Sequence, residues 1–169
     1  MGDDKSVSVP IKVVALGIDH LAAVDAIMRT AFDPKYGEAW NSAQVLSTLA
    51  IPGYQLRGAF VVQAEQYLAG FAITRVVARE SELLLLAVDP QWQRVGVASA
   101  LLNDWLATCD FDGVTMAFLE MREDNPAKSL YQACGFAEAA IRTSYYRGGD
   151  GVMRNALTMN RRLVDGHLF

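Results

Sequence analysis

A short turn between an apolar run and a helical pattern carries residue types that suit phosphate binding. Residues 83–102 read LLLLAVDPQWQRVGVASALL, in which Gln93, Gly96 and Ala98 match the spacing Q/R-x-x-G-x-G/A. Small residues at a helix N-terminus let backbone N–H groups approach a pyrophosphate closely, and the helix dipole favours its negative charge. The turn predicts a phosphate-bearing ligand, although so short a pattern on its own more often marks an ordinary strand–loop–helix connection.

Two segments of the chain together resemble the GNAT superfamily, whose members transfer acetyl groups from acetyl-coenzyme A to amines. AVDPQWQRVGVASALL is similar to the cofactor-binding motif of the superfamily, and LEMREDNPAKSLYQACGF is similar to its second hallmark. FAITRVVARESELLLLAVDP and IRTSYYRGGDG resemble the branch that acetylates ribosomal-protein alanine N-termini. The resemblance covers roughly residues 60–160, and two motifs in the expected order are far more specific than either alone.

The resemblance implies how acetyl-coenzyme A is bound. The phosphates would lie on the turn, and a backbone N–H in the strand segment Leu86–Val88, where members of the superfamily carry a bulge, would stabilise the oxyanion that forms at the thioester carbonyl. From Glu120 to Tyr131 the chain has eleven positions, one fewer than expected for the branch, which leaves Asp124 as an alternative to Asn125. The expected cofactor-binding residues are Leu86, Ala87, Val88, Gln93, Arg94, Val95, Gly96, Val97, Ala98, Ser99 and Asn125, and no metal is expected.

Tyr131 and Glu120 occupy positions to which the resemblance assigns proton transfer. Tyr131 lies in LYQACGF, which is similar to the motif L-Y-x-x-x-G-F that carries the general acid of the superfamily. A phenol with a reference pKa of about 10 retains a proton that it can share with a departing thiolate. Glu120 corresponds to the carboxylate that accepts the amine proton in the branch. The structural alternatives are a core position for Tyr131 and an ion pair of Glu120 with Arg122 or Arg142.

The basicity of the acceptor decides how strong that base must be. An α-amine has a reference pKa of about 8 and a lysine side chain one of about 10.4, so a much larger share of the α-amine is neutral near pH 7. A modest carboxylate therefore suffices for a protein or peptide N-terminus, which is the expected acceptor. A small-molecule amine is the alternative, because the early segment FDPKYGEAWN departs from the branch. A non-catalytic acyl-coenzyme A sensor is the alternative from another class, against which the presence of both Tyr131 and Glu120 argues.

Aromatic residues from two distant segments would form the rim of the acceptor cleft. Tyr145 and Tyr146 precede the turn GGDG, and Trp40 would lie opposite them, together with Tyr36 and Glu38 of the same early segment. We therefore expect Trp40, Tyr145 and Tyr146 to bind the substrate. Packing between neighbouring strands explains aromatic residues in a hairpin equally well.

The apolar pattern predicts one α/β domain, residues 1–169, with a mixed sheet. Helices between strands in the middle and hairpins at both ends indicate this arrangement. The resemblance implies the GNAT-type acyl-coenzyme A N-acyltransferase fold, in which two central strands, 83–88 and 114–120, splay apart and admit the cofactor. Strands are predicted at 7–16, 54–63, 67–77, 83–88, 114–120, 136–147 and 152–160, with a hairpin turn near 64–66, and helices at 19–30, 42–50, 95–108 and 126–134.

Composition limits the partners and the location. Of 169 residues, 52% are hydrophobic and 20% are charged, which is typical of a globular protein with a sizeable core. A net charge of −4 argues against a nucleic-acid partner. Cys109 and Cys134 lack the neighbours of a zinc site and favour a reducing cytoplasm. The start MGDDKSVSVP has no apolar leader and the longest apolar run, 83–88, is too short to cross a membrane, so no membrane partner is expected. A homodimer through the terminal strands is left open.

Overall fold

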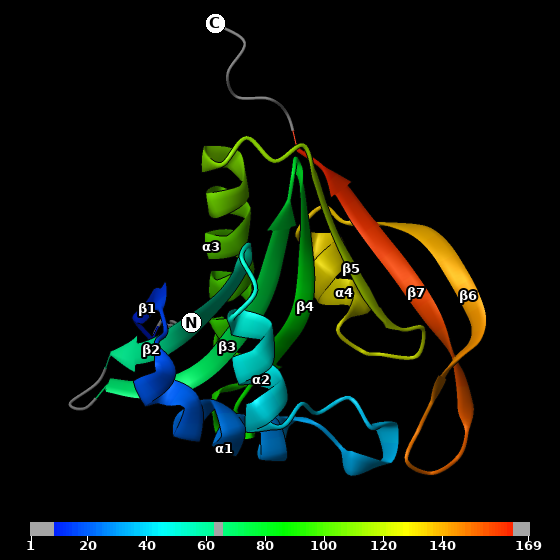
Figure 1. The fold of residues 1–169 in the computed structure, drawn as a ribbon, viewed down its shortest axis with the longest axis horizontal. Coiled ribbons are helices and arrows are strands. Elements are labelled where there is room, and N and C mark those ends of the chain that lie inside the picture. Colours follow the sequence, from blue (N-terminus) through cyan, green and yellow to red (C-terminus); the bar gives the residue numbers. More distant parts are fainter. Residues whose placement is uncertain (1–8, 63–65, 164–169) are drawn as a thin grey trace, which may run out of the picture.

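One mixed sheet of seven strands joins the parts of the chain that the computed structural model describes, residues 9–62 and 66–163 (Figure 1). The strand order is β1-β2-β3-β4-β5-β7-β6, and every neighbouring pair is antiparallel except β4 and β5. The strands are β1 (Ile11–Ala15), β2 (Tyr54–Val62), β3 (Gln66–Val77), β4 (Glu80–Val88), β5 (Met116–Arg122), β6 (Ala137–Arg147) and β7 (Met153–Arg162).

Helices cover both faces of this sheet, and each face has its own apolar core. The helices are α1 (Leu21–Ala31), α2 (Ser42–Leu49), α3 (Val97–Phe111) and α4 (Lys128–Ala133), with short 3₁₀ helices η1 (Ile18–His20), η2 (Pro34–Tyr36) and η3 (Pro90–Trp92). Val24 and Met28 of α1 and Val45 of α2 belong to one core, whereas Leu102 and Trp105 of α3 belong to the other. β4 contributes Leu83 to the core under α3 and Leu85 and Ala87 to the core under α1 and α2, so its position is fixed from both sides.

The central strands β4 and β5 separate after a few residues of pairing. Glu80–Leu83 of β4 pair with Met116–Leu119 of β5, and no further pairs between the two strands occur among the described residues. The register of β4 against β3 shifts at the same place, since Thr74 pairs with Leu83 but Ile73 pairs with Leu85. The extra residue of this bulge, Leu84, bends β4 away from β5, as β-bulges do. A wedge therefore opens between the ends of the two strands.

The predicted mixed α/β fold with splayed central strands is confirmed, and the differences lie at element boundaries. The helix predicted to begin at residue 95 begins at Val97, because Arg94 and Gly96 have φ values of +66° and +97° that a right-handed helix excludes. The bulge expected within residues 86–88 lies at Leu84. Part of the first predicted strand, residues 7–8, and residues 64–65 of the predicted turn lie outside the described residues.

The helix predicted from residue 126 begins at Lys128, since the Asn125 side chain caps the preceding turn by accepting a hydrogen bond from the Ala127 N–H at 2.9 Å. Within the described ranges, no helix has both the length and the apolarity that crossing a bilayer requires.

Candidate active site

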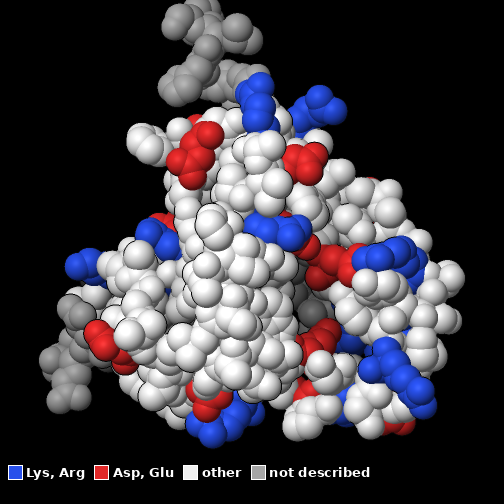
Figure 2. All heavy atoms as spheres, in the orientation of Figure 1, with Lys and Arg blue, Asp and Glu red and all other residues white. Residues whose placement is uncertain are grey.

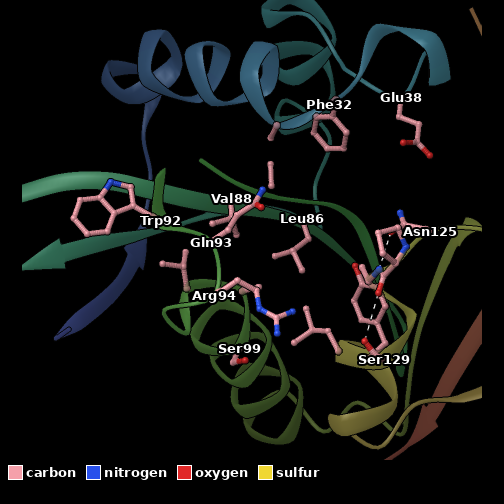
Figure 3. Close-up of a pocket in the computed structure, with 18 of the residues that line it drawn as sticks. Phe32, Glu38, Leu86, Val88, Trp92, Gln93, Arg94, Ser99, Asn125 and Ser129 are labelled. Carbon is pink, nitrogen blue, oxygen red and sulfur yellow. Dashed lines mark hydrogen bonds between the residues drawn. The ribbon is translucent and has the colours of Figure 1, made fainter. Parts of the chain in front are cut away.

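A cavity of about 840 Å³ occupies the wedge between β4 and β5 (Figure 3). One wall consists of the end of β4, the following turn and the start of α3. The opposite wall consists of the end of β5, the segment before α4, and α4 itself. The segment that follows α1 closes the cavity from the other side of the sheet. The lining residues discussed below are Phe32, Tyr36, Glu38, Leu86, Ala87, Val88, Gln93, Arg94, Gly96, Val97, Ala98, Ser99, Arg122, Asn125 and Tyr131.

The predicted phosphate turn has the geometry that anion binding requires. Gly96 lies just before α3 with a φ of +97°, and the first bond of the helix runs from the Ala100 N–H to the Gly96 carbonyl at 2.9 Å. The N–H groups of residues 97–99 have no acceptor among the described residues, which is the usual state of a helix N-terminus. Three donors therefore lie at the cavity wall, where the helix dipole is positive.

Side chains fix this turn from behind. The carboxylate of Asp89 accepts the Gln91 N–H at 2.9 Å and the Tyr67 hydroxyl at 2.7 Å. The Tyr67 ring packs on the Trp92 ring with centroids 5.9 Å apart. Asp89 therefore holds η3 in place, and with it the start of the turn.

The structure brings all but one of the expected cofactor-binding residues to the cavity. Val95 is the exception, since its side chain is exposed and does not line the cavity. Figure 3 shows Gln93 and Arg94 on the wall formed by the turn, with Leu86 and Val88 above them. The last part of β4, beyond Leu83, carries backbone groups that face the cavity without a partner strand in the described chain.

Asn125 and not Asp124 lies at the cavity. Asn125 lines it, whereas Asp124 pairs with Arg122 and lies 3.9 Å from the Nε of Arg154, outside the lining. A tight turn closed by the bond from the Asn125 N–H to the Arg122 carbonyl accommodates the shorter interval between Glu120 and Tyr131. Asn125, and not Asp124, therefore lines the cavity.

Tyr131 is held in α4 with its ring buried and its hydroxyl directed to the cavity side. The residue is 8% exposed and packs edge-on against Phe136, at a centroid distance of 6.3 Å. Its hydroxyl makes no hydrogen bond to the described part of the chain. Burial raises the pKa of the Tyr131 phenol, and the nearby Cys134 and Glu38 add to the rise. The phenol therefore keeps its proton at any ordinary working pH.

Glu120 lies outside the cavity lining, and both of its oxygens are engaged. Its Oε1 accepts the Tyr146 hydroxyl at 3.1 Å, and its Oε2 pairs with the Arg142 guanidinium. Of the two ion pairs considered from the sequence, the one with Arg142 forms; Arg122 instead pairs with Glu38. Burial, followed by the charge of Glu120, raises the pKa of Tyr146, so this hydroxyl also remains a donor.

A wide bulge in β6 brings Tyr146 to Glu120. Between the pairs Arg142–Ala156 and Tyr146–Arg154, three residues of β6 face a single residue of β7. Ser144 within this bulge has a φ of +51°, and its N–H is held by the Asn155 side chain at 3.0 Å. Tyr145, in contrast, is exposed and lies beside Arg142, whose guanidinium carbon is 3.6 Å from the ring centroid.

Trp40 is placed away from the cavity. It precedes Asn41, which caps α2 together with Gln44 in a reciprocal capping box with bonds of 2.8 and 2.9 Å. A hydrophobic residue at this position commonly packs on the fourth residue of the helix, and Trp40 packs against the cluster that contains Val45. Trp40 therefore anchors α2, while Tyr36 and Glu38 of the same segment reach the cavity.

Two residues that were not predicted for the site, Phe32 and Arg122, also line the cavity. Figure 3 shows Phe32 and Glu38 on the wall across from Asn125. Arg122 is buried at the end of β5, and the alternation along this strand puts it on the same face as Glu120. That alternation was the available signal, although it does not reveal the partner, because Glu38 is 84 positions away. The described residues contain no group of three or more His, Cys, Asp or Glu placed to hold a metal.

Comparisons with known proteins agree on one family. The family description "Acetyltransferase (GNAT) domain" matches residues 55–138. The [ribosomal protein bS18]-alanine N-acetyltransferase of Escherichia coli K12 is 45% identical over 85 residues, which are 50% of this chain and 57% of that protein. The chain thus matches little more than half the length of this curated relative.

Solved structures extend the likeness to nearly the whole chain. The crystal structure of the ribosomal-protein-S18-alanine N-acetyltransferase from Escherichia coli is 30% identical, with a TM-score of 0.79 over 95% of this chain and 99% of that one. Arabidopsis thaliana NAA60 in complex with acetyl-CoA is 17% identical, with a TM-score of 0.77 over 91% and 99% of the two chains, and this likeness concerns the fold alone.

Proposed function

Because the chain belongs to the GNAT acetyltransferase family, we propose that it transfers an acetyl group from acetyl-coenzyme A to the α-amine of a protein or peptide N-terminus. The observation that supports this most is the continuity of the cavity. It extends from the donors at the start of α3, past the end of β4 that is not paired with β5, to Tyr131 and the segment after α1. A phosphate-bearing donor and an amine entering from opposite sides would meet beside Tyr131.

The residues along the first wall fit acetyl-coenzyme A as a co-substrate. The N–H groups of residues 97–99 and the side chains of Gln93 and Arg94 would hold its phosphates, since small residues there leave the backbone accessible. Asn125 would contact it from the opposite wall. A backbone N–H in the segment from Leu86 to Val88 would stabilise the oxyanion. The co-substrate supplies an acetyl group activated as a thioester.

Tyr131 is the proposed general acid. Its buried phenol lies at the cavity and retains its proton, which it would donate to the leaving thiolate. Glu120 is the proposed acceptor of the amine proton; it lies outside the cavity lining and accepts the Tyr146 hydroxyl at 3.1 Å. An α-amine with a reference pKa of about 8 makes a smaller demand on a base than a lysine side chain does, because a much larger share of it is neutral near pH 7.

The remaining features concern partners, location and assembly. We propose that the chain forms a single domain, since one sheet joins all the described strands. Cys109 and Cys134 are free thiols, which supports a reducing, cytoplasmic location. On the face drawn in Figure 2, acidic and basic side chains are interspersed, and a net charge of −4 supports a partner other than nucleic acid. A homodimer, if it forms, would use the exposed edge strand β6.

Mass spectrometry with a mixed panel of acceptors tests the proposed function. The panel contains ribosomal-protein N-terminal peptides, the same peptides with blocked N-termini, lysine peptides and small amines, each incubated with acetyl-coenzyme A. Acetylation of the free N-terminal peptides and none of the blocked ones supports the proposal. Transfer only to small amines would replace the acceptor, and tight binding of coenzyme A without any product would indicate a sensor.

A further inference from the structure

Two carboxylates line the cavity on the segment after α1, those of Asp33 and Glu38, and both oxygens of Asp33 are engaged by Lys35. Building on the proposed function, we propose that Glu38 binds the amino group of the acceptor and thereby selects a free N-terminus. Glu38 lines the cavity with Tyr131 and the end of β4, whereas Glu120 does not. Glu38 is therefore the carboxylate of this lining that keeps an oxygen without a partner among the described residues.

Glu38 has one oxygen anchored and one available. The Nε of Arg122 donates to Oε1 of Glu38 at 2.7 Å, and Oε2 has no partner within the described part of the chain. The Glu38 side chain is 22% exposed and belongs to the cavity lining. Glu120, in contrast, uses Oε1 for Tyr146 and Oε2 for Arg142. A bond from an amine to Glu120 would have to replace one of these contacts.

Arg122 makes Glu38 a rigid receptor for an amine. Its side chain is only 5% exposed, and its guanidinium carbon lies 3.4 Å from the centroid of the Tyr36 ring. The same ring lies 4.9 Å from the guanidinium carbon of Arg154, so that Tyr36 is held from two directions. A hydrogen-bond acceptor fixed in this way before binding loses little conformational entropy when the ligand arrives.

The turn between β6 and β7 also fixes the segment between α1 and α2 that carries Glu38. The Asp150 N–H donates to the Lys35 carbonyl at 3.3 Å, and a side-chain carbon on Gly149 would lie 2.7 Å from the Pro34 carbonyl oxygen. Only glycine permits so close an approach. The segment between α1 and α2 therefore rests on β5 through Arg122 and on the hairpin through this turn.

Glu38 is also within electrostatic reach of the proposed proton-transfer groups. Its charge contributes to the raised pKa of Tyr131 and to that of Tyr146. Figure 3 shows Glu38 on the wall across from Asn125. An amine held at Oε2 of Glu38 would thus lie within electrostatic reach of both Tyr131 and Tyr146.

Binding of paired peptides tests this assignment. One peptide has a free N-terminus, and its desamino analogue is identical except that hydrogen replaces the α-amino group. Calorimetry with coenzyme A present gives the dissociation constant of each peptide for wild type, Glu38→Gln and Asp124→Asn. Asp124→Asn is the matched control, because Asp124 shares Arg122 with Glu38 but lies outside the cavity.

We expect Glu38→Gln to weaken binding of the amino peptide about tenfold, as loss of a hydrogen bond to a charged group does. Binding of the desamino peptide should change less than twofold, and so should all values for Asp124→Asn. Two results would overturn the assignment. Equal weakening of the binding of both peptides by Glu38→Gln would indicate that the substitution displaces the segment between α1 and α2. Unchanged binding of both peptides would indicate that Glu38 does not contact the amine.

Acetylation by the wild-type enzyme separates this inference from the proposed function. If wild type acetylates the amino peptide while Glu38→Gln binds both peptides as wild type does, only the assignment of Glu38 fails. If wild type acetylates no N-terminal peptide, the proposed function fails and the assignment fails with it.

Discussion

The two ends of the cavity are built in different ways. The proposed cofactor end comes mainly from one continuous stretch, residues 86–99, and offers backbone N–H groups at the start of α3. The acceptor end is assembled from segments far apart in the chain, as the contact between Glu38 and Arg122 across 84 positions illustrates, and it presents charged and aromatic side chains. A site made of backbone follows from local geometry, whereas a site made of distant side chains depends on the whole fold.

The two ends of the cavity also differ in the interactions that stabilise them. The turn before α3 is fixed by φ values and helix geometry, which salt does not affect. The acceptor end depends on ion pairs that reach the surface, such as Arg142 with Glu120 and Arg154 with Asp150, and exposed pairs are weak and screened by salt. We therefore expect substitutions to separate the two ends: one group should affect acetyl-coenzyme A and the other should affect the acceptor.

The largest effect is expected at Tyr131, where the two ends meet. Tyr131→Phe removes the proposed proton donor and should lower kcat about 100- to 1000-fold, with both KM values within about twofold of wild type. The melting temperature should hardly change, since the Tyr131 hydroxyl has no bond to the described part of the chain. Steady-state kinetics with each substrate varied in turn measures this, and a wild-type kcat would exclude Tyr131 as the acid.

Arg122 tests the acceptor end. Arg122→Met leaves Glu38 and Asp124 without their shared partner and should lower the free energy of unfolding by about 2 kcal/mol, because breaking a buried ion pair is costly. Binding of acetyl-coenzyme A should be retained. Arg142→Met, at an exposed ion pair, serves as control and should leave stability nearly unchanged. Chemical denaturation and calorimetry give both quantities; equal losses in the two variants would contradict the importance of burial.

Gly96 tests the cofactor end. Gly96→Ala places a side chain at a φ of +97°, a conformation that costs about 1–2 kcal/mol outside glycine. The dissociation constant for acetyl-coenzyme A should rise about five- to tenfold, while the KM of the peptide stays the same. Gly17→Ala is a suitable control, since Gly17 has a φ of −102° and no atom within 4 Å of an added side-chain carbon. A change in peptide KM alone would show that the two ends are not separable.

The pH profile should show the smallest effect. Burial raises the pKa of Tyr131 above its ordinary value of about 10, so the phenol stays protonated as the pH rises toward that value. Between pH 7 and 10, the kcat of wild type should therefore show no decline caused by Tyr131. Any decline that does occur should also be present in Tyr131→Phe. A raised pKa in the folded state also means that the contribution of Tyr131 to stability is fully present below about pH 10 and is lost above it. A Tyr131-dependent decline near pH 8 would contradict the burial of this phenol.

The same contrast explains what the sequence could predict. The strand, turn and helix around Gly96 depend on residues close together in the chain, so their pattern predicts the cofactor end directly. The left-handed conformation of Arg94, which delays α3, leaves no mark in residue type. At the acceptor end, the alternation in β5 predicts that Glu120 and Arg122 share a face, but which acid pairs with which arginine depends on how the segment after α1 docks.

Trp40 shows the opposite case, in which a residue close in sequence to the site lies away from the cavity. Its proximity in sequence to Glu38 suggests a shared role at the cleft, yet the capping box at Asn41 directs Trp40 to the core beneath α2. The run WNSAQV contains this capping pattern, so the placement could have been predicted from helix-start chemistry.

The most direct test of the account is to locate the acetyl group on a peptide that offers two kinds of amine. Wild-type protein is incubated with acetyl-coenzyme A and a peptide that has a free N-terminal alanine and one internal lysine, and tandem mass spectrometry assigns the modified nitrogen. The account predicts acetylation of the α-nitrogen with the lysine unmodified. Acetylation of the lysine alone, or of neither amine, would contradict it.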